Sequence, residues 1–528
     1  MLKNIRKLID IGAALSHEEN ETKLMEMIVD VGRMCTNADG ATLYIKSEDG
    51  RTLRFEIIQT RSLNIFMGGS REKITWQDIN LFNEDGTENH SNVSSHVALT
   101  GKTIDINDVY TAKGFDFSGA KAFDLQTSYR SKSMLVVPLK DHENEIIGVI
   151  QLINSHDTKS GSVIPFSTES QKITESLSSQ AAVVLTKNKL LKGLEELFNS
   201  FLRTIAKAID EKSHYTSGHI NRVTEITMKI ANKINKENNG RFADVKFSND
   251  ELNELRIAAW MHDIGKITTP EYIIDKATKL ETIYDRINEI ETRFELFKRD
   301  AEIKLLKKKL ELIKNGKEKD IITYEEEYQK EISKIDNAFT LISQANKGVE
   351  AMSDTNIEMV KDMATNSWKK RGKIEPWLSE NEVTNLTIIR DTLTDDEREI
   401  IKNHASLTES MLKELPFPKK LKNVQKYACC HHETLTGTGY PNKLKGGEIP
   451  LQGRIIAFAD IFEALSASDR PYKTGKTTSE VINIIGNMVI YQNLDADIAN
   501  MFLNDKIFFD YVKEHFNPNQ IDIEMDCR

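Results

Sequence analysis

Hydrophobic and polar positions change their period several times along the chain. Between residues 8 and 35, apolar residues recur at three- and four-residue steps, which predicts a helix. Residues 41–60 then form two alternating runs around a polar turn at Glu48-Asp49-Gly50, a pattern typical of a β-hairpin, and residues 133–154 repeat it. We therefore expect residues 1–160 to form an α+β domain in which helices flank an antiparallel sheet.

One long helical pattern covers residues 167–209. Apolar residues recur in it every seven positions, with two further apolar residues three positions after two of them: Leu177, Val184, Leu191, Phe198 and Ile205, then Leu194 and Phe201. Such a seam suits a parallel coiled coil that joins two protomers, so we predict a homodimer through this linker helix. The alternative is a single helix that packs on its own domain.

A different helical pattern occupies residues 281–345. Two stripes with steps of four and three residues lie on either side of a turn signal at Asn315-Gly316. Their members are Ile283, Ile287, Ile290, Phe294, Phe297 and Ala301, then Tyr328, Ile332, Ile335, Phe339 and Ile342. We predict an antiparallel helical hairpin whose mixed charges are solvated and carry no chemistry.

Composition and charge narrow the possible functions. The 528-residue chain has a net charge of -10, which argues against nucleic-acid binding, so an anionic ligand needs a locally positive site. Its four cysteines, two of them adjacent, indicate no disulfide framework and fit a reducing compartment. No apolar run reaches the length of about 18 residues that a membrane span needs. We expect a soluble cytoplasmic protein of two to four domains with no membrane contact.

The most unusual stretch is CCHHETLTGTGYP at residues 429–441. Adjacent residues on a helix diverge by about 100°, so two cysteines and two histidines in a row cannot surround one zinc ion. We predict that Cys429 and Cys430 are small core residues of a helix. The two histidines then need partners from elsewhere in the chain.

Such partners occur in several apolar helical stretches. With the two histidines they make five histidines and two aspartates: His219, His262, Asp263, His404, His431, His432 and Asp460. An acid such as Asp460, within RIIAFADIFEAL, is costly in an apolar helix unless it is paired or bound to a cation. The set supplies enough ligands for two divalent metal ions. Imidazole and carboxylate without thiolate favour iron, manganese or another borderline metal.

These motifs together resemble a known family. The doublet His262-Asp263, HHE followed by GTGYP, then LKGGEIP and DIFEALSASDRPYK are similar to the HD-GYP branch of the HD phosphohydrolases, which hydrolyses cyclic dinucleotides. The N-terminal region resembles a GAF domain, best in PLKDHENEIIGVIQLIN. The resemblance implies a GAF sensor at 1–160 with an unknown small-molecule ligand, a linker helix at 167–209, and an all-α HD-GYP domain at 205–280 and 393–528. The helical hairpin then lies in an insertion, residues 281–392, within the catalytic domain.

In the GAF domain, Asn107-Asp108 and Phe123-Asp124 are placed where they could reach a ligand pocket. The alternative is that they cap loops and turns.

The resemblance also implies roles for the seven ligands. His219, His262, Asp263 and Asp460 would hold one metal ion, and Asp263, His404, His431 and His432 the other, with Asp263 bridging. A hydroxide shared by the two ions would attack phosphorus in line.

Four further residues are expected to contact the substrate. Lys266, one turn after Asp263, would neutralise a phosphoryl oxygen and so join Asp263 as a catalytic residue. Arg470 and Lys473 would add positive charge. Tyr440 would line the cleft, the alternative being an ordinary turn tyrosine.

Two departures from the family pattern matter. Tyr215 stands where some members carry a glutamate for a third metal, so we expect two metals, and Thr436 stands where aspartate is common. We predict a metal-dependent phosphodiesterase that acts on cyclic di-GMP or a related cyclic dinucleotide and is regulated by its GAF domain. The alternatives are an HD phosphohydrolase for linear nucleotides and a non-catalytic dinucleotide receptor.

Overall fold

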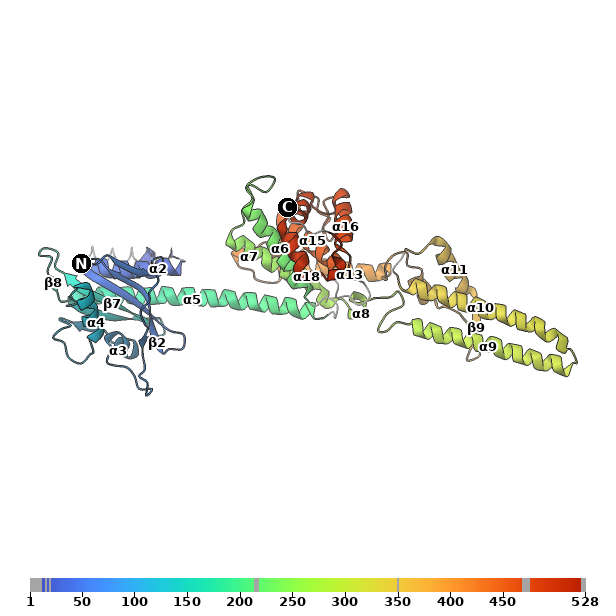
Figure 1. Cartoon of the computed structure of the whole chain (residues 1–528), viewed down its shortest axis with the longest axis horizontal. Helices are drawn as coiled ribbons and strands as arrows, with labels where there is room; N and C mark the ends of the chain where they lie inside the picture. Colours follow the sequence, from blue (N-terminus) through green and yellow to red (C-terminus); the bar gives the residue numbers. More distant parts are fainter. Residues whose placement is uncertain are drawn as a thin grey trace. The chain divides into compact units, whose positions relative to one another are not determined.

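The computed structural model describes residues 12–14, 17–18, 20–212, 218–348, 351–467 and 475–523 (Figure 1). These residues fall into two compact units, Met1–Phe198 and Asn199–Arg528. Within the described ranges, every helix is too short or too polar to cross a membrane.

The first unit is built on an antiparallel sheet. Its strands lie in the order β3-β2-β1-β7-β6-β5, with β4 paired to β2 and β8 paired to β7. The strands are β1 (Ala38–Lys46), β2 (Thr52–Thr60), β3 (Ile65–Gly68), β4 (Ile79–Asn80), β5 (Ile104–Ile106), β6 (Met134–Lys140), β7 (Ile146–His156) and β8 (Val163–Ile164). Both predicted hairpins, β1–β2 and β6–β7, are confirmed.

Helices cover both faces of this sheet. The core on one face joins the sheet to α2 (Glu21–Thr36) and to the first part of α5 (Thr168–Asp210). The core on the other face lies under α3 (Val93–Thr100) and the start of α4 (Ser118–Thr127). The helix predicted over residues 8–35 is interrupted before Glu21. Residues 12–14 and 17 are helical, and α2 then begins at Glu21, where the Asn20 side chain caps it by accepting from the Lys23 N–H. The predicted α+β class is confirmed.

The candidate ligand residues of this unit have structural contacts. Asp124 is buried and accepts hydrogen bonds from the Tyr110 hydroxyl and from the backbone and hydroxyl of Ser131. Asp108 accepts from the backbone N–H of Tyr110, two residues on, as a turn residue does. Both contacts fit the alternative that these acids cap loops.

The coiled-coil seam predicted along α5 is wrong over its first part. Leu177 and Val184 are buried within the chain, and Val184 belongs to the core beneath the sheet, so neither can face a second protomer. Further along, five apolar side chains are exposed: Leu190, Leu191, Leu194, Leu197 and Phe201. The alternative, a helix packed on its own domain, holds for the first part of α5.

The second unit is helical. Its elements outside residues 281–392 are α6 (His219–Lys236), α7 (Asn249–Met261), η1 (Ile264–Thr268), α8 (Glu271–Ile274), α13 (Asp395–Lys413), η3 (Lys419–Leu421), α14 (Val424–Ala428), α15 (Leu451–Ser466), α16 (Thr478–Ile490), α17 (Ala496–Leu503), α18 (Lys506–His515) and η4 (Pro518–Gln520). Helix α6 packs on α7 and α15, and α13 packs on η1 and α14. Phe458 and Phe462 of α15 anchor an aromatic core with Phe502, Phe508 and Tyr511.

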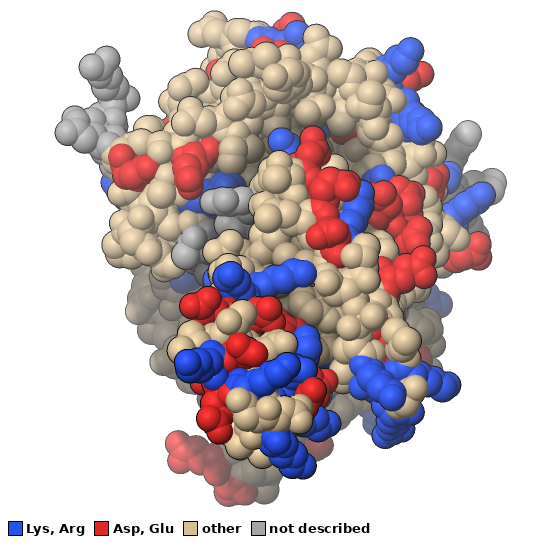
Figure 2. Space-filling model, turned by 90° about the vertical axis from the view of Figure 1, so that its right-hand side faces the viewer, with Lys and Arg blue, Asp and Glu red and all other residues tan. Residues whose placement is uncertain are grey.

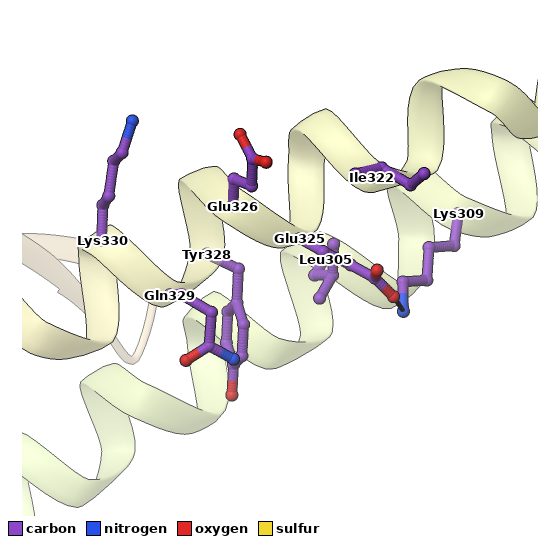
Figure 3. Close-up of a pocket in the computed structure, with 8 residues that line it drawn as sticks. All are labelled: Leu305, Lys309, Ile322, Glu325, Glu326, Tyr328, Gln329 and Lys330. Carbon is purple, nitrogen blue, oxygen red and sulfur yellow. Dashed lines mark hydrogen bonds and ion pairs between the residues drawn. The ribbon is translucent and has the colours of Figure 1, made fainter.

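Between α8 and α13 the chain forms a separate cluster of elements. They are α9 (Ile287–Lys314), η2 (Glu318–Asp320), α10 (Ile321–Asn346), α11 (Asp354–Thr365), β9 (Ser367–Lys370), β10 (Lys373–Pro376) and α12 (Glu380–Leu386). Ion pairs Lys309–Glu325 and Lys298–Asp336 join α9 to α10 in antiparallel order, and Figure 3 shows the first of them beside a shallow pocket. The predicted helical pair is therefore present, but Ile283, 92% exposed and outside α9, does not belong to its stripe. The boundaries 281 and 392 stay a prediction.

Two buried lysines fasten this cluster to the rest of the unit. Lys276 Nζ donates to both carboxylate oxygens of Glu397, at 2.8 and 2.9 Å, and to Asn385. Lys279 Nζ donates to the Ile388 carbonyl at 2.6 Å, and burial lowers the pKa of this lysine. Because Glu397 lies in the first turn of α13, the cluster is bonded to the helix that carries His404.

Candidate metal centre

A close helix contact positions His262 and Asp263. Helix α7 ends at Met261, and η1 begins directly after Asp263. A Cβ on Gly265 would lie 2.0 Å from the His404 carbonyl oxygen, so only glycine lets η1 approach α13 this closely. The Thr408 hydroxyl secures the contact, because it accepts from the Gly265 N–H at 3.0 Å and donates to the His262 carbonyl at 3.2 Å.

The HHE and GTGYP motifs form one folded loop. Helix α14 ends at Ala428, so His431 and His432 lie on a turn, where adjacent side chains can converge. The Glu433 carboxylate, 4% exposed, accepts from the backbone N–H groups of Asn442 and Leu444 and closes the loop. A Cβ on Gly439 would lie 2.5 Å from the His432 carbonyl oxygen, which explains a glycine there.

One group of ligands gathers around His219 and His262. Nε2 of His219 lies 3.3 Å from Asp460 Oδ1 and 3.6 Å from Asp263 Oδ2. Nε2 of His262 lies 3.8 and 3.3 Å from the same two oxygens. All four side chains are largely buried, and they come from α6, the α7–η1 junction and α15.

A second group consists of three histidines. Nε2 of His404 lies 3.2 Å from Nε2 of His431 and 3.2 Å from Nε2 of His432. Asp263 joins this group to the first, because its Oδ1 lies 3.3 Å from His404 Nε2 and 3.8 Å from His431 Nε2. One carboxylate thus presents one oxygen to each group.

The hydrogen bonds of these histidines fit a bound cation. Nδ1 of His262, His404 and His431 contacts the carbonyl oxygens of Ala259, Ile401 and Ala428 at 2.5–2.8 Å. A carbonyl only accepts, so each Nδ1 carries the proton and each neutral ring leaves a lone pair on Nε2. Lone pairs 3.2 Å apart repel unless a cation lies between them. The buried Nε2 atoms of His219 and His262 also form no hydrogen bond with any of the described residues, although carboxylate oxygens lie near them.

Without metal, the two groups hold different charges. Burial lowers the pKa of His432 to about 4 and also holds the pKa of His404 and His431 below the usual value, so these rings are neutral near pH 7. For His262 burial acts in the same direction, but Asp263 and Asp460 outweigh it and raise its pKa to about 9. Glu463, with both aspartates, likewise raises the pKa of His219 against burial. Metal at the first group must therefore displace protons.

Sequence reasoning missed two residues behind the first group. Glu463, one turn after Asp460 on α15, contacts His219 Nδ1 with one oxygen and accepts from Arg222 Nε at 2.6 Å with the other. A carboxylate behind a histidine ligand fixes the ring and its tautomer. Glu463 could have been predicted from the sequence, because it is, like Asp460, an acid in an apolar helix and therefore needs a partner.

The remaining predicted residues have mixed outcomes. Lys266 Nζ lies 2.5 Å from Asp263 Oδ2, beside the site, and its role stays a prediction. The Tyr440 ring stacks on His432 with centroids 4.7 Å apart. Arg470, Lys473 and Tyr215 lie outside the described residues, and Thr436 contacts the hydroxyl groups of Thr434 and Thr438. Cys429 and Cys430 are buried and free of disulfides, as predicted, but the prediction that they lie on a helix is wrong, because α14 ends at Ala428 and both follow it in a turn.

A third group of potential ligands is less suited to a metal. Glu225, Glu514 and His515 lie together on the surface. Lys229 already lies between the two glutamates, at 2.8 and 3.2 Å, and supplies the cation there.

Residues at the end of α5 and just after it contact the start of α6 and the short helix η1. Asp210 accepts from the Gly218 N–H at 2.6 Å, at the start of the helix that carries His219. Lys212 Nζ donates to the carbonyl oxygens of Lys266, Ile267 and Thr269 at 3.2, 2.5 and 2.6 Å, and so holds η1. Asp210, at the end of α5, and Lys212, just after it, thus connect the start of α6, which carries His219, to η1, which directly follows Asp263.

Comparison with known proteins identifies both parts of the chain. Residues 20–185 match the GAF domain family, and residues 216–342 and 380–498 match two HD domain families. A segment of 120 residues, 22% of this chain, is 37% identical to 25% of 3'3'-cGAMP-specific phosphodiesterase 3 of Vibrio cholerae. Another of 96 residues, 18% of this chain, is 40% identical to 26% of a cyclic di-GMP phosphodiesterase of Thermotoga maritima. The chain thus spans about a quarter of the length of these curated relatives.

Among solved structures, the GAF domain of an Acinetobacter phosphoenolpyruvate-protein phosphotransferase is similar at 11% identity and a TM-score of 0.25, covering 36% of this chain and 98% of that one. The fold and the family matches define a protein with an N-terminal GAF domain and a helical HD domain. The HHE and GTGYP motifs at the site resemble the HD-GYP type of HD domain.

Proposed function

We propose that this protein is a metal-dependent phosphodiesterase that hydrolyses cyclic di-GMP or a related cyclic dinucleotide. The observation that carries the proposal is the position of Asp263, whose two oxygens face two separate histidine groups. A bridging carboxylate between two sets of imidazoles suits a pair of divalent cations such as iron or manganese. The names of the V. cholerae and T. maritima relatives support the choice of substrate.

The chain would bind two ions with seven side chains. His219, His262, Asp263 and Asp460 would hold one ion, and Asp263, His404, His431 and His432 the other. Two such ions supply a hydroxide at neutral pH and accept charge from phosphoryl oxygens. Glu463 would keep His219 in place, and the three backbone carbonyls would keep Nε2 of His262, His404 and His431 directed at the ions.

Other side chains would hold the substrate. Lys266, 28% exposed at its side chain, would turn from Asp263 to a phosphoryl oxygen when the dinucleotide binds, because its Nζ already lies at the edge of the site. Tyr440, stacked on His432, would offer a ring face to a base. We assign Arg470 and Lys473 to phosphate binding from the sequence.

The test combines metal analysis with product analysis. Protein purified without oxygen should contain two divalent ions per chain and convert a cyclic dinucleotide to a linear product on chromatography. Turnover of linear nucleotides alone would support a different HD phosphohydrolase. Tight binding of a cyclic dinucleotide without turnover, in metal-loaded protein, would support a receptor.

We also propose that the GAF domain regulates this site through α5. The supporting contacts are those of Asp210 and Lys212, which connect the end of α5 to the elements that carry His219 and Asp263. Catalysis depends on sub-ångström placement of ligands, so a small movement of this end would change activity. The exposed residues Leu190, Leu194, Leu197 and Phe201, at steps of four, three and four, support dimerisation through this part of α5.

A further inference from the structure

Helix α9 has two apolar faces, and α10 covers only one. Ile290, Phe294 and Phe297 are buried in the core that α9 shares with α10, and Ala301 is buried as well. A second row is 47–60% exposed: Leu296, Ile303, Leu306, Leu310 and Ile313. These residues follow one another at steps of seven, three, four and three, which is the spacing of a coiled-coil seam.

The charges beside this exposed row separate along the helix. In the seam's heptads, Asp300 and Glu302 flank the first half, and Lys307 and Lys309 flank the second. A row that is acidic at one end and basic at the other does not match a surface of single sign, such as nucleic acid. Such a row is complementary in charge to a second copy of itself that runs in the opposite direction.

We propose that the exposed row binds α9 of a second copy of this chain, in antiparallel orientation. With Ile303 opposite the partner's Leu306, Asp300 faces the partner's Lys307 and Glu302 faces the partner's Lys309. The two-fold axis repeats both contacts, so four pairs of opposite charge form.

Other arrangements place like charges together. Moving the antiparallel register by one heptad sets Lys307 opposite the partner's Lys307, or Asp300 opposite the partner's Asp300. A parallel pair sets Glu295 opposite the partner's Asp300 and Lys309 opposite the partner's Lys314. Charge therefore selects one orientation and one register.

Figure 2 draws one face of the molecule with its charged side chains coloured by sign. On the face that it draws, basic and acidic side chains are interspersed, in a chain whose net charge is -10. Two of the four flanking groups also have partners within their own chain, because Glu302 pairs with Arg299 and Lys309 with Glu325. Asp300 and Lys307 are exposed and are the better sites for a test.

The experiment measures self-association of the full chain by sedimentation equilibrium. Leu190→Glu with Leu197→Glu first removes any association through α5, and this background protein should still form dimers. Asp300→Lys in that background should weaken the dimer about tenfold or more, since two attractive pairs become repulsive. Adding Lys307→Asp should restore it, because the reversed pairs again attract across the antiparallel contact.

The controls separate this interface from its alternatives. Glu291→Lys, an exposed charge reversal on the same helix but away from the seam, should leave the dimer unchanged. In a parallel pair, Lys307→Asp would face the partner's Glu302, so failure of the double variant to recover overturns the proposal. A background protein that is monomeric at its highest soluble concentration also overturns it.

Discussion

The variant Glu463→Gln tests how the first group of ligands is held. Glu463 is 1% exposed, contacts His219 Nδ1 with one oxygen and accepts from Arg222 with the other. Glutamine keeps the size of the side chain and removes its charge. Its amide has a single oxygen, so either His219 or Arg222 loses an acceptor.

We expect the variant to lose a modest part of its metal affinity, by an amount that depends on pH. Removing the hydrogen-bond partner behind a metal ligand weakens metal affinity about 10- to 100-fold, which is about 1.4–2.7 kcal/mol. Glu463 also raises the pKa of His219, and a protonated ring cannot bind metal. Below that pKa, metal binding to the wild-type protein must remove a proton from His219. In the variant the pKa of His219 is lower, so a smaller fraction of the rings carries that proton. The deficit of the variant should therefore grow as pH rises and wild-type His219 deprotonates.

The assay is Mn²⁺ binding to metal-free protein in competition with a chelating dye, between about pH 6.5 and 8.5. Glu237→Gln is the matched control, because Glu237 lies at the other end of α6, away from the metal site, and pairs with Lys233 at the surface. Affinity at the second group, whose histidines are already neutral, should be unchanged. Equal affinities for wild type and Glu463→Gln at every pH would refute the assignment of Glu463 as the support of His219.

Three further predictions address the site and its control. His431→Ala or His432→Ala should lower the metal content toward one ion per chain and abolish hydrolysis in a protein with unchanged circular dichroism; full metal and activity in both would contradict the two-metal assignment. Lys266→Ala should keep both ions by elemental analysis and lose turnover, because charge stabilisation of phosphoryl oxygens is removed, and normal turnover would make Lys266 a surface charge. Inserting one residue near Lys192 turns the rest of α5 by about 100°, and inserting seven nearly restores it, so hydrolysis should change sharply and then recover. Equal activity in both insertions would make α5 a passive tether.

The sequence predicted the elements that depend on local periodicity. Alternation in 41–60 and 133–154 corresponds to strand pairs β1–β2 and β6–β7, because side chains of a strand point alternately to its two faces. The stripes at Phe294 and Ile335 correspond to the buried contact of α9 with α10. In each case the residues that decide the structure lie within about 20 positions of one another, so their pattern is visible in a short window.

Other features depend on which surfaces meet, and periodicity does not contain that information. The seven-residue step through Leu177 and Val184 fits a coiled coil and the packing of α5 on the GAF sheet equally well. In the structure both residues are buried, and Val184 belongs to the core beneath the sheet. Similarly, the pairing of Glu463 with His219 joins positions 244 residues apart. The motifs gather the ligands through a family resemblance. Glu463 even lies within the quoted stretch DIFEALSASDRPYK, but nothing in that stretch shows that its partners are His219 and Arg222.

The charges at the site would allow so acidic a chain to bind an anion, as the proposed function requires. Three carboxylates, Asp263, Asp460 and Glu463, face two cationic side chains, Lys266 and Arg222, which leaves one net negative charge while the histidines are neutral. Two divalent ions would add four positive charges and leave the site with a net charge of plus three, although the chain carries -10. An excess positive charge of this size at a buried site must be compensated by the charge of the ligand that binds there. The two phosphodiester charges of a cyclic dinucleotide, together with a hydroxide nucleophile, supply the three negative charges that are needed, whereas a neutral ligand leaves the site uncompensated.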